Sequence, residues 1–388
     1  MSAQPFIQTD LIIIGGGVAG LWTLAQAQQA GYNAILFESN TLGGKQTLAS
    51  QGIIHGGLKY ALSSSISSAT EAIQSMPRRW QAALNGNGPV SLSKTKKLSA
   101  AHYFVLTQSI ESRLISFLGS KLADSYSTKV NTNTLAVDYQ QITQSPYLYA
   151  LNEFVIDTQS LLKDLSSQLE ERLFQHHFDA NLLTLSPHGD YQYQTNSFSL
   201  QTKSVLFANG EGFHSTQYHS AQKQNRPLHM VMMKSASLPY IFAHFIGKGT
   251  KPQLTVTSYR DETGTTWYLG GQLAEAGINR TEAKQIDATR QLLKKLLPQL
   301  SLDSCRFATL MINRAEAKQT KLIKPDEAYV KAEQNCLVAW PTKLAFAPQL
   351  GDSVLQQLPQ PSTKPNDLSS LRQTLSLPAV GEYPWSAL

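Results

Sequence analysis

The chain has 388 residues, of which 41% are hydrophobic and 15% charged, the composition of a globular protein large enough for two or three domains. No apolar run approaches the ~18 residues that cross a bilayer, the first ten residues lack a signal-peptide pattern, and two cysteines disfavour a disulfide framework. We therefore expect a cytoplasmic protein. The net charge of +6 is spread along the chain, which argues against a nucleic-acid partner and suits an anionic substrate or an acidic membrane surface.

A dinucleotide-binding unit is predicted near the amino terminus. Leu11–Ile14 is an apolar run typical of a buried parallel strand, a helical stretch follows, and Ala34–Phe37 is a second strand that ends at Glu38. Between the first strand and the helix, glycines recur in G-x-G-x-x-G spacing at Gly15, Gly17 and Gly20. Such glycines allow a tight turn, close approach of the backbone to a pyrophosphate and close helix–strand packing, and the acid accepts hydrogen bonds from a ribose. This pattern alone leaves FAD and NAD open.

Two later segments favour FAD. Lys203–Gly212, KSVLFANGEG, resembles the second flavin-domain signature of glutathione-reductase-like flavoproteins. Together with Ser50–Tyr60, SQGIIHGGLKY, it makes the chain resemble the D-amino-acid-oxidase-like (DAO) FAD oxidoreductases, which include glycine oxidase and FAD-linked glycerol-3-phosphate dehydrogenase. The resemblance implies an α/β fold: a Rossmann-like, GR2-type domain that binds FAD non-covalently, interleaved with an α+β substrate domain on a large mixed, mostly antiparallel β-sheet.

The resemblance covers most of the chain and implies interleaved domain boundaries. The FAD-binding domain would comprise residues 1–87, 151–222 and 315–388, and the substrate domain residues 88–150 and 223–314. The stretch from Pro359, PQPSTKPNDLSS, is linker-like and is expected to run over the surface.

Most of the expected cofactor contacts fall in the amino-terminal third of the chain. The resemblance places these residues at FAD: Gly15, Gly17, Val18, Ala19, Gly20, Glu38, Ser39, Lys45, Gln46, Thr47, Ala49, Ser50, Gln51, Gly52, His55, Gly56, Gly57, Leu182, Ala208, Asn209, Gly210, Arg314, Thr342, Lys343, Leu344, Ala345 and Phe346. For His55 we favour positioning of the flavin over catalysis or a structural role. We find no metal-ligand spacing among the nine histidines.

The candidate catalytic residues come from both ends of the chain. Arg314 would hold the charged end of the substrate, because a guanidinium binds carboxylate or phosphate in a planar fork. Lys343 would stabilise negative charge on the reduced flavin. Lys59 and Tyr60 occupy the place of an arginine and a tyrosine in glycerol-3-phosphate dehydrogenases, and His229 is a candidate proton acceptor.

Two departures from the family pattern leave the substrate open. The arginine strand reads Ile312-Asn313-Arg314-Ala315 where the family usually has Gly-x-Arg-Pro, and Trp340–Lys343 replaces a glycine-rich loop. We expect an FAD-dependent oxidoreductase that transfers a hydride to flavin N5 from a C–H next to an amine or hydroxyl of a small, anionic substrate. Oxygen or a quinone would be the electron acceptor, and a monomer is the expected state.

Other classes of function stay open from the sequence. The positive charge and the unusual Asn313 and Ala315 fit a flavoprotein that acts on a macromolecular or RNA-borne group, or a flavin-binding module without oxidase or dehydrogenase activity. An NAD-only dehydrogenase is a third alternative.

Overall fold

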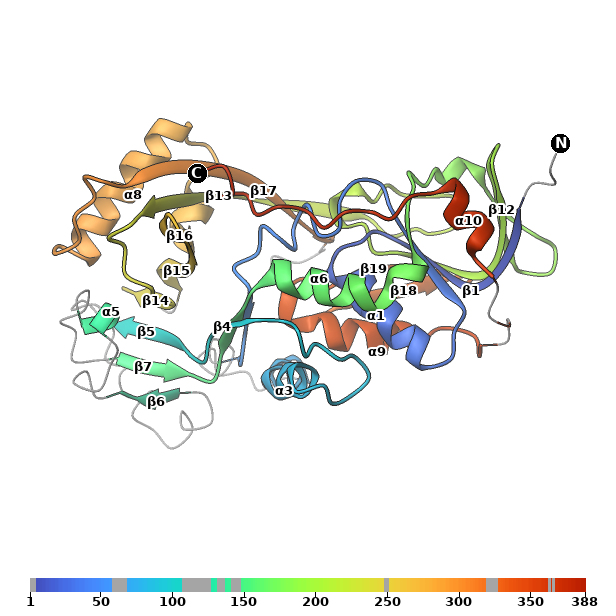
Figure 1. The fold of residues 1–388 in the computed structure, drawn as a ribbon, viewed down its shortest axis with the longest axis horizontal. Helices are drawn as coiled ribbons and strands as arrows, with labels where there is room; N and C mark the ends of the chain where they lie inside the picture. Colours follow the sequence, from blue (N-terminus) through green and yellow to red (C-terminus); the bar gives the residue numbers. More distant parts are fainter. Residues whose placement is uncertain are drawn as a thin grey trace.

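Figure 1 shows the fold in a computed structural model, which describes residues 5–57, 68–106, 127–130, 137–140, 148–247, 251–318, 327–361, 364 and 367–388. Two large sheets lie toward opposite ends of an elongated molecule, one parallel at its centre and the other mostly antiparallel. This arrangement confirms the predicted fold class. Within the described residues, no helix is long and apolar enough to cross a membrane.

The first sheet has a parallel centre. Leu11–Ile14 is fully or almost fully buried, as expected for a parallel strand covered on both faces. The parallel strands, in spatial order, are β19 (Cys336–Trp340), β12 (Ser199–Phe207), β1 (Phe6–Ile14), β2 (Ala34–Glu38) and β9 (Leu173–Gln175). The antiparallel strands are β18 (Tyr329–Glu333) beside β19, β11 (Tyr191–Gln194) beside the first half of β12, and β10 (Leu183–Leu185) on the far side of β11.

Helices cover one face of the first sheet and aromatic side chains cover the other. α1 (Val18–Gln29), α6 (Thr158–Leu169) and α9 (Ala347–Leu355) share one core with the sheet, and α3 (Ser68–Leu84) joins it through Trp80. Asp157 fixes the start of α6 by accepting a 2.6 Å hydrogen bond from the backbone N–H of Ser160. On the opposite face, Phe37, Phe174 and Phe207 pack together with α10 (Ser369–Thr374).

The second sheet is antiparallel except where β14 meets β5. Its strands, in order, are β17 (Arg306–Ala317), β13 (Lys223–Ser235), β16 (Gly264–Gly270), β15 (Pro252–Asp261), β14 (Ala243–Ile246), β5 (His102–Leu106), β7 (Leu148–Leu151) and β6 (Ser127–Lys129). α8 (Glu282–Leu296) packs on one face, with α7 (Gln272–Ala276) and α5 (Val137–Gln140) nearby. The predicted domain boundary between residues 314 and 315 falls inside β17, so this strand runs without a break from one part of the molecule into the other.

Short elements join the two parts. A small sheet of β3 (Ile53–Ile54), β8 (Phe154–Ile156) and β4 (Lys97–Ser99) lies between them. The 3₁₀ turns within the described ranges are η3 (Glu170–Arg172), η4 (Ala180–Leu182), η5 (Gly210–Gly212) and η6 (Leu344–Phe346).

The carboxyl-terminal segment contacts both parts of the molecule. Val380 forms a β-bridge with Leu42 beside the first sheet. On the second sheet, the ring centre of the buried Trp385 lies 4.2 Å from that of Tyr259 and 4.8 Å from that of Tyr268. The chain beyond the linker-like stretch is therefore packed against the core, because its aromatic residues bury their rings there.

Candidate functional site

A cavity of 1220 Å³ lies between the two large sheets. On one side it is lined by the carboxyl ends of β1, β2, β12 and β19, which is where open α/β sheets bind ligands. On the other side it is lined by β13, β14, β15, β16 and β17. These predicted site residues line it: Gly15, Gly17, Val18, Ala19, Glu38, Ser39, Lys45, Gln46, Thr47, Ala49, Ser50, Gln51, Gly52, His55, Ala208, Asn209, Gly210, Arg314, Thr342, Lys343 and Leu344.

The three motif glycines stand in different surroundings. Gly15 has φ +110°, and a Cβ atom there would lie 2.6 Å from Cα of Asn209. A Cβ at Gly20 would lie 2.0 Å from the carbonyl oxygen of Gly15, so Gly20 serves helix packing and does not line the cavity. A Cβ at Gly17 would have only the hydroxyl oxygen of Thr47 nearby, at 3.3 Å. The backbone at Gly17 is therefore open to the cavity.

The amino terminus of α1 is built to receive an anion. Its N-cap is Gly17, which has no side chain to cap the first N–H groups. The hydroxyl of Thr47 accepts a 3.0 Å hydrogen bond from the N–H of Val18. Unsatisfied N–H groups and the helix dipole favour negative charge at such an end, which suits a pyrophosphate.

Glu38 lies at the end of β2, on the wall of the cavity. Its carboxylate accepts hydrogen bonds from the N–H groups of Gly16, at 2.7 Å, and Asn40, at 2.9 Å. These bonds fix the carboxylate beside the glycine turn, where it can accept hydrogen bonds from ribose hydroxyls.

The loop that follows Thr47 is fastened to the second sheet. The amide of Gln51 donates to the carbonyls of Tyr268, at 3.0 Å, and Thr255, at 3.3 Å. The hydroxyl of Tyr268 donates to the carbonyl of Ala49 at 2.9 Å. These bonds set the position of one cavity wall relative to the other.

Two glycines expected at the cofactor serve backbone packing instead. A Cβ at Gly56 would lie 2.2 Å from the carbonyl oxygen of Asn152, and one at Gly57 would lie 2.7 Å from a methyl group of Ile73. Neither glycine lines the cavity. They are small because the chain passes close to the turn before β8 and to α3.

Three further residues predicted at the cofactor also lie off the cavity. Ala345 and Phe346 in η6 are completely buried in the core beneath the first sheet. Leu182 in η4 is 41% exposed, although its neighbours Ala180 and Asn181 line the cavity. Side-chain direction in a 3₁₀ turn decides which of its residues reach the cavity.

Arg314 lies in the cavity wall with an unusual electrostatic environment. It stands directly opposite Arg226 in the β13–β17 pair, and Arg226 itself pairs with Glu316 at 3.5 Å. Burial, together with Arg226, lowers the pKa of Arg314, while Glu275 and Glu316 raise it. Within the described residues, the buried Nε–H of Arg314 has no hydrogen-bond partner. A buried guanidinium donor without a partner is costly, and an anionic ligand would satisfy it.

The first departure from the family pattern has a local explanation. The amide of Asn313 donates a 2.7 Å hydrogen bond to the carboxylate of Glu211 in η5. Glu211 lines the cavity next to Gly210. Asn313 therefore ties β17 to the end of β12, beside Arg314.

The loop after β19 also reaches the cavity. Thr342 has φ +58°, a left-handed conformation, and it directs the chain into η6. Lys343 lines the cavity and its ammonium lies 5.8 Å from the ring centre of Phe346. Lys59 and Tyr60 fall outside the residues that the structure describes.

His229 does not line the cavity, so its side chain is not in a position to act there as the predicted proton acceptor. Its Nδ1 lies 2.9 Å from the carbonyl of Gly277, and its own carbonyl accepts a hydrogen bond from Gln285 of α8. Side chains alternate along a strand, so Leu228 and Met230 face the cavity instead.

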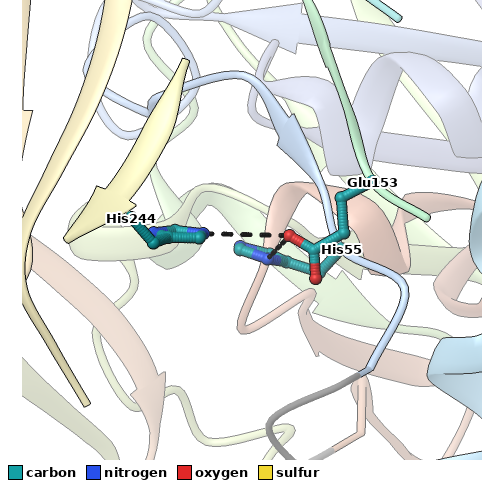
Figure 2. Close-up of side chains that lie close together, drawn as sticks. All are labelled: His55, Glu153 and His244. Carbon is teal, nitrogen blue, oxygen red and sulfur yellow. Dashed lines mark hydrogen bonds and ion pairs between the residues drawn. The ribbon is translucent and has the colours of Figure 1, made fainter. Parts of the chain in front are cut away.

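Tertiary contacts bring His55 together with two residues that sequence reasoning missed, Glu153 and His244 (Figure 2). Nδ1 of His55 lies 3.1 Å from Oε2 of Glu153, and Nε2 of His244 lies 3.8 Å from the same oxygen. Burial raises the pKa of Glu153, but the two histidines outweigh it and hold that pKa well below its usual value. Burial lowers the pKa of His244, while Glu153 raises it.

The sequence carried only weak signals for these residues. Glu153 is a charged residue between apolar segments in LNEFVI, and His244 interrupts the apolar run IFAHFI. A buried polar residue in such a run needs a partner, but sequence spacing does not say which one.

The comparisons with known proteins agree with this geometry. The family model described as DAO, FAD dependent oxidoreductase, matches residues 10–316. A curated protein of Pseudomonas aeruginosa, the probable FAD-dependent oxidoreductase PA4991, is 37% identical over 391 residues, covering 98% of both chains. The crystal structure of the FAD-dependent oxidoreductase PA4991 matches with a TM-score of 0.81 and 32% identity, over 99% of both chains.

More distant structures share the fold. Glycine oxidase from Geobacillus kaustophilus matches with a TM-score of 0.63 and 13% identity, over 94% of this chain and 97% of its own. L-alpha-glycerophosphate oxidase from Mycoplasma pneumoniae, solved with FAD bound, matches with a TM-score of 0.66 and 14% identity, over 92% and 97% of the two chains. A pyrophosphate fits the amino terminus of α1, whose N-cap residue Gly17 has no side chain and an open backbone. The ribose of such a cofactor fits the carboxylate of Glu38.

Proposed function

The chain belongs to the DAO family of FAD-dependent oxidoreductases, and we propose that it removes a hydride from a carbon next to an amine or hydroxyl of a small anionic substrate. Bound FAD supplies the hydride acceptor, its N5 atom. What the chain itself must do is hold the cofactor, bind the charged end of the substrate and keep the reacting carbon in place.

Arg314 is the observation that carries the proposal. Its Nε–H is buried without a partner among the described residues, it faces the cavity, and Arg226 opposite adds a second positive charge. A carboxylate or phosphate in the cavity would pair with the guanidinium of Arg314, since Arg226 already has Glu316 as its ion-pair partner. Glu275, also on the cavity wall, lies close enough to raise the pKa of Arg314, so it limits how much anionic charge the pocket favours.

We place the cofactor in the same cavity. The pyrophosphate would lie at Gly17 and the amino terminus of α1, with the ribose at Glu38. The loop Ala49–Gln51 would lie beside the ring, since its bonds to β15 and β16 hold it between the two sheets. Lys343 would add positive charge near the cofactor and favour its reduced, anionic form.

A substrate panel tests the proposal directly. The FAD-loaded protein is mixed without oxygen with amino acids, amines, hydroxy acids and sugar or glycerol phosphates, and the flavin absorption is followed. At least one anionic amine or hydroxy compound should bleach the flavin. If only neutral compounds bleach it, or none does, the proposed substrate class is wrong.

The electron acceptor is tested with the same protein. We propose oxygen or a quinone. After bleaching, the flavin is exposed first to air and then, in a separate sample, to a soluble quinone without oxygen. Faster return of the flavin absorption with one of them identifies the acceptor, and no return with either contradicts this part of the proposal.

A further inference from the structure

His55, Glu153 and His244 come from three separate segments and present ligand atoms to one point (Figure 2). His55 follows β3, Glu153 lies in the turn before β8, and His244 is on β14. One ligand atom from each side chain lies within 4.8 Å of the other two. Both histidines line the cavity, and Glu153 is buried behind them.

The two separations from the carboxylate of Glu153 fit a tetrahedral ion. Zinc binds histidine nitrogen and carboxylate oxygen at about 2.0–2.1 Å, so two of its ligand atoms stand about 3.3 Å apart. Here, the separations from Oε2 of Glu153 are 3.1 Å to Nδ1 of His55 and 3.8 Å to Nε2 of His244. These two distances bracket the required value, and the longer one exceeds that of a direct hydrogen bond.

Groups behind two of the three side chains, His244 and Glu153, hold them in orientations suited to a metal. The other ring nitrogen of His244, Nδ1, lies 2.8 Å from the hydroxyl of Thr255. The other carboxylate oxygen of Glu153 accepts a 3.2 Å hydrogen bond from the N–H of Gly56. Metal-binding histidines and carboxylates have such supporting bonds, which fix the ring tautomer and the direction of the lone pairs.

The charge and the ligand types select the class of ion. A buried carboxylate with two imidazoles brings one negative charge to a site that borders the cavity through both histidines. Nitrogen donors favour zinc-like transition ions over magnesium or calcium, which prefer oxygen. Two histidines and one glutamate are the ligand set of catalytic zinc sites that keep a position open.

We propose that His55, Glu153 and His244 form a binding site for one divalent transition ion of the zinc class, with its open position toward the cavity. The site shares His55 with the residues expected at FAD, contains neither Gly17 nor Glu38, and does not depend on the proposed substrate. The open position would accept a water molecule or an oxygen atom of a ligand in the cavity.

Metal titration of the FAD-loaded protein tests the site. The protein is treated with a chelator and dialysed, then titrated with Zn²⁺ by calorimetry, and with Co²⁺ to read the visible bands of tetrahedral coordination. We expect one equivalent to bind. Glu153→Gln should weaken binding more than about a hundredfold, and Thr255→Val, which removes only the support of His244, about 10–100-fold. His188→Asn, in an exposed turn, is the matched control and should bind as the wild type does.

The outcomes are decisive without an activity assay. If the wild type shows no saturable binding at millimolar Zn²⁺, the three side chains form a self-contained ion-pair network and the proposal is wrong. Equal affinity of Glu153→Gln and His188→Asn would also overturn it. Should Glu153→Gln fold poorly, the comparison of Thr255→Val with His188→Asn still decides the question.

Discussion

The hydroxyl of Tyr268, on β16 of the second sheet, donates a 2.9 Å hydrogen bond to the carbonyl of Ala49, in the loop Ala49–Gln51 that lines the cavity. Tyr268 is fully buried, and Ala49 is only 5% exposed. This bond joins the two sheets where the cavity lies between them.

Replacing Tyr268 with phenylalanine should therefore weaken both folding and cofactor retention. Loss of a buried hydrogen bond with one partner left unsatisfied costs about 1–3 kcal/mol of unfolding free energy. Tyr218→Phe removes a comparable bond to the carbonyl of Leu183, away from the loop, and is the control. Urea unfolding and FAD dissociation are measured for both; equal FAD affinity in the two variants would contradict the role of Tyr268.

Gly17→Ala should reduce FAD affinity without unfolding the protein. The φ of Gly17 is −77°, which alanine adopts readily, and a Cβ there meets only Thr47 within 4 Å. The added methyl group would occupy the approach of the pyrophosphate, while the stability of the cofactor-free protein should change by less than about 1 kcal/mol.

Gly31→Ala is the opposite case and serves as its control. Gly31 has φ +85°, and a Cβ there would meet no other atom within 4 Å. Alanine should therefore cost about 1–2 kcal/mol of stability through backbone strain alone and leave FAD binding unchanged. Unfolding and FAD titration are compared for both variants. Equal effects of the two on FAD affinity would show that Gly17 is not at the pyrophosphate.

Arg314→Met should weaken the binding of an anionic ligand. Hydrogen bonds to charged groups contribute about 1.5–3 kcal/mol, so carboxylate affinity should fall about tenfold to a hundredfold. The measurement is the perturbation of the flavin spectrum by simple carboxylates. Arg290→Met, whose guanidinium lies 4.2 Å from the ring of Phe307 outside the cavity, should bind them as the wild type does. Unchanged binding in Arg314→Met would remove the main support for an anionic substrate.

Acid should destabilise the protein in part through His176. This ring lies 5.0 Å from Phe37 and 2.8 Å from the hydroxyl of Tyr193, and burial, followed by the neighbouring His177, lowers its pKa. A histidine whose pKa is lower in the folded state stabilises the fold above its unfolded pKa of about 6.5, and that stability is lost as the pH falls below it.

The test is the slope of unfolding free energy against pH between pH 7 and 5. Each proton bound only by the unfolded chain contributes up to about 1.4 kcal/mol per pH unit. His176→Asn should have a shallower slope than the wild type, whereas His188→Asn, in an exposed turn, should keep the wild-type slope. Parallel slopes for wild type and His176→Asn would contradict the prediction.

The sequence by itself determined the dinucleotide unit and the family. The glycine turn, α1 and Glu38 lie within one contiguous stretch, and their roles depend on local backbone geometry and short spacing, which a sequence displays directly. The segments Lys203–Gly212 and Ile312–Ala315 resemble or depart from family motifs in ways visible in the sequence, and residues of both line the cavity.

Only the tertiary structure decided which side chains face the cavity. His229 and Met230 are neighbours on one strand. The ring of His229 contacts the carbonyl of Gly277 just after α7, whereas Met230 lines the cavity. The register of β13 against β16 and β17 fixes which face each side chain takes. His55 and Glu153 are 98 residues apart, and their meeting with His244 depends on how three short elements pack between two sheets. Long-range packing of this kind leaves no periodic trace in the sequence.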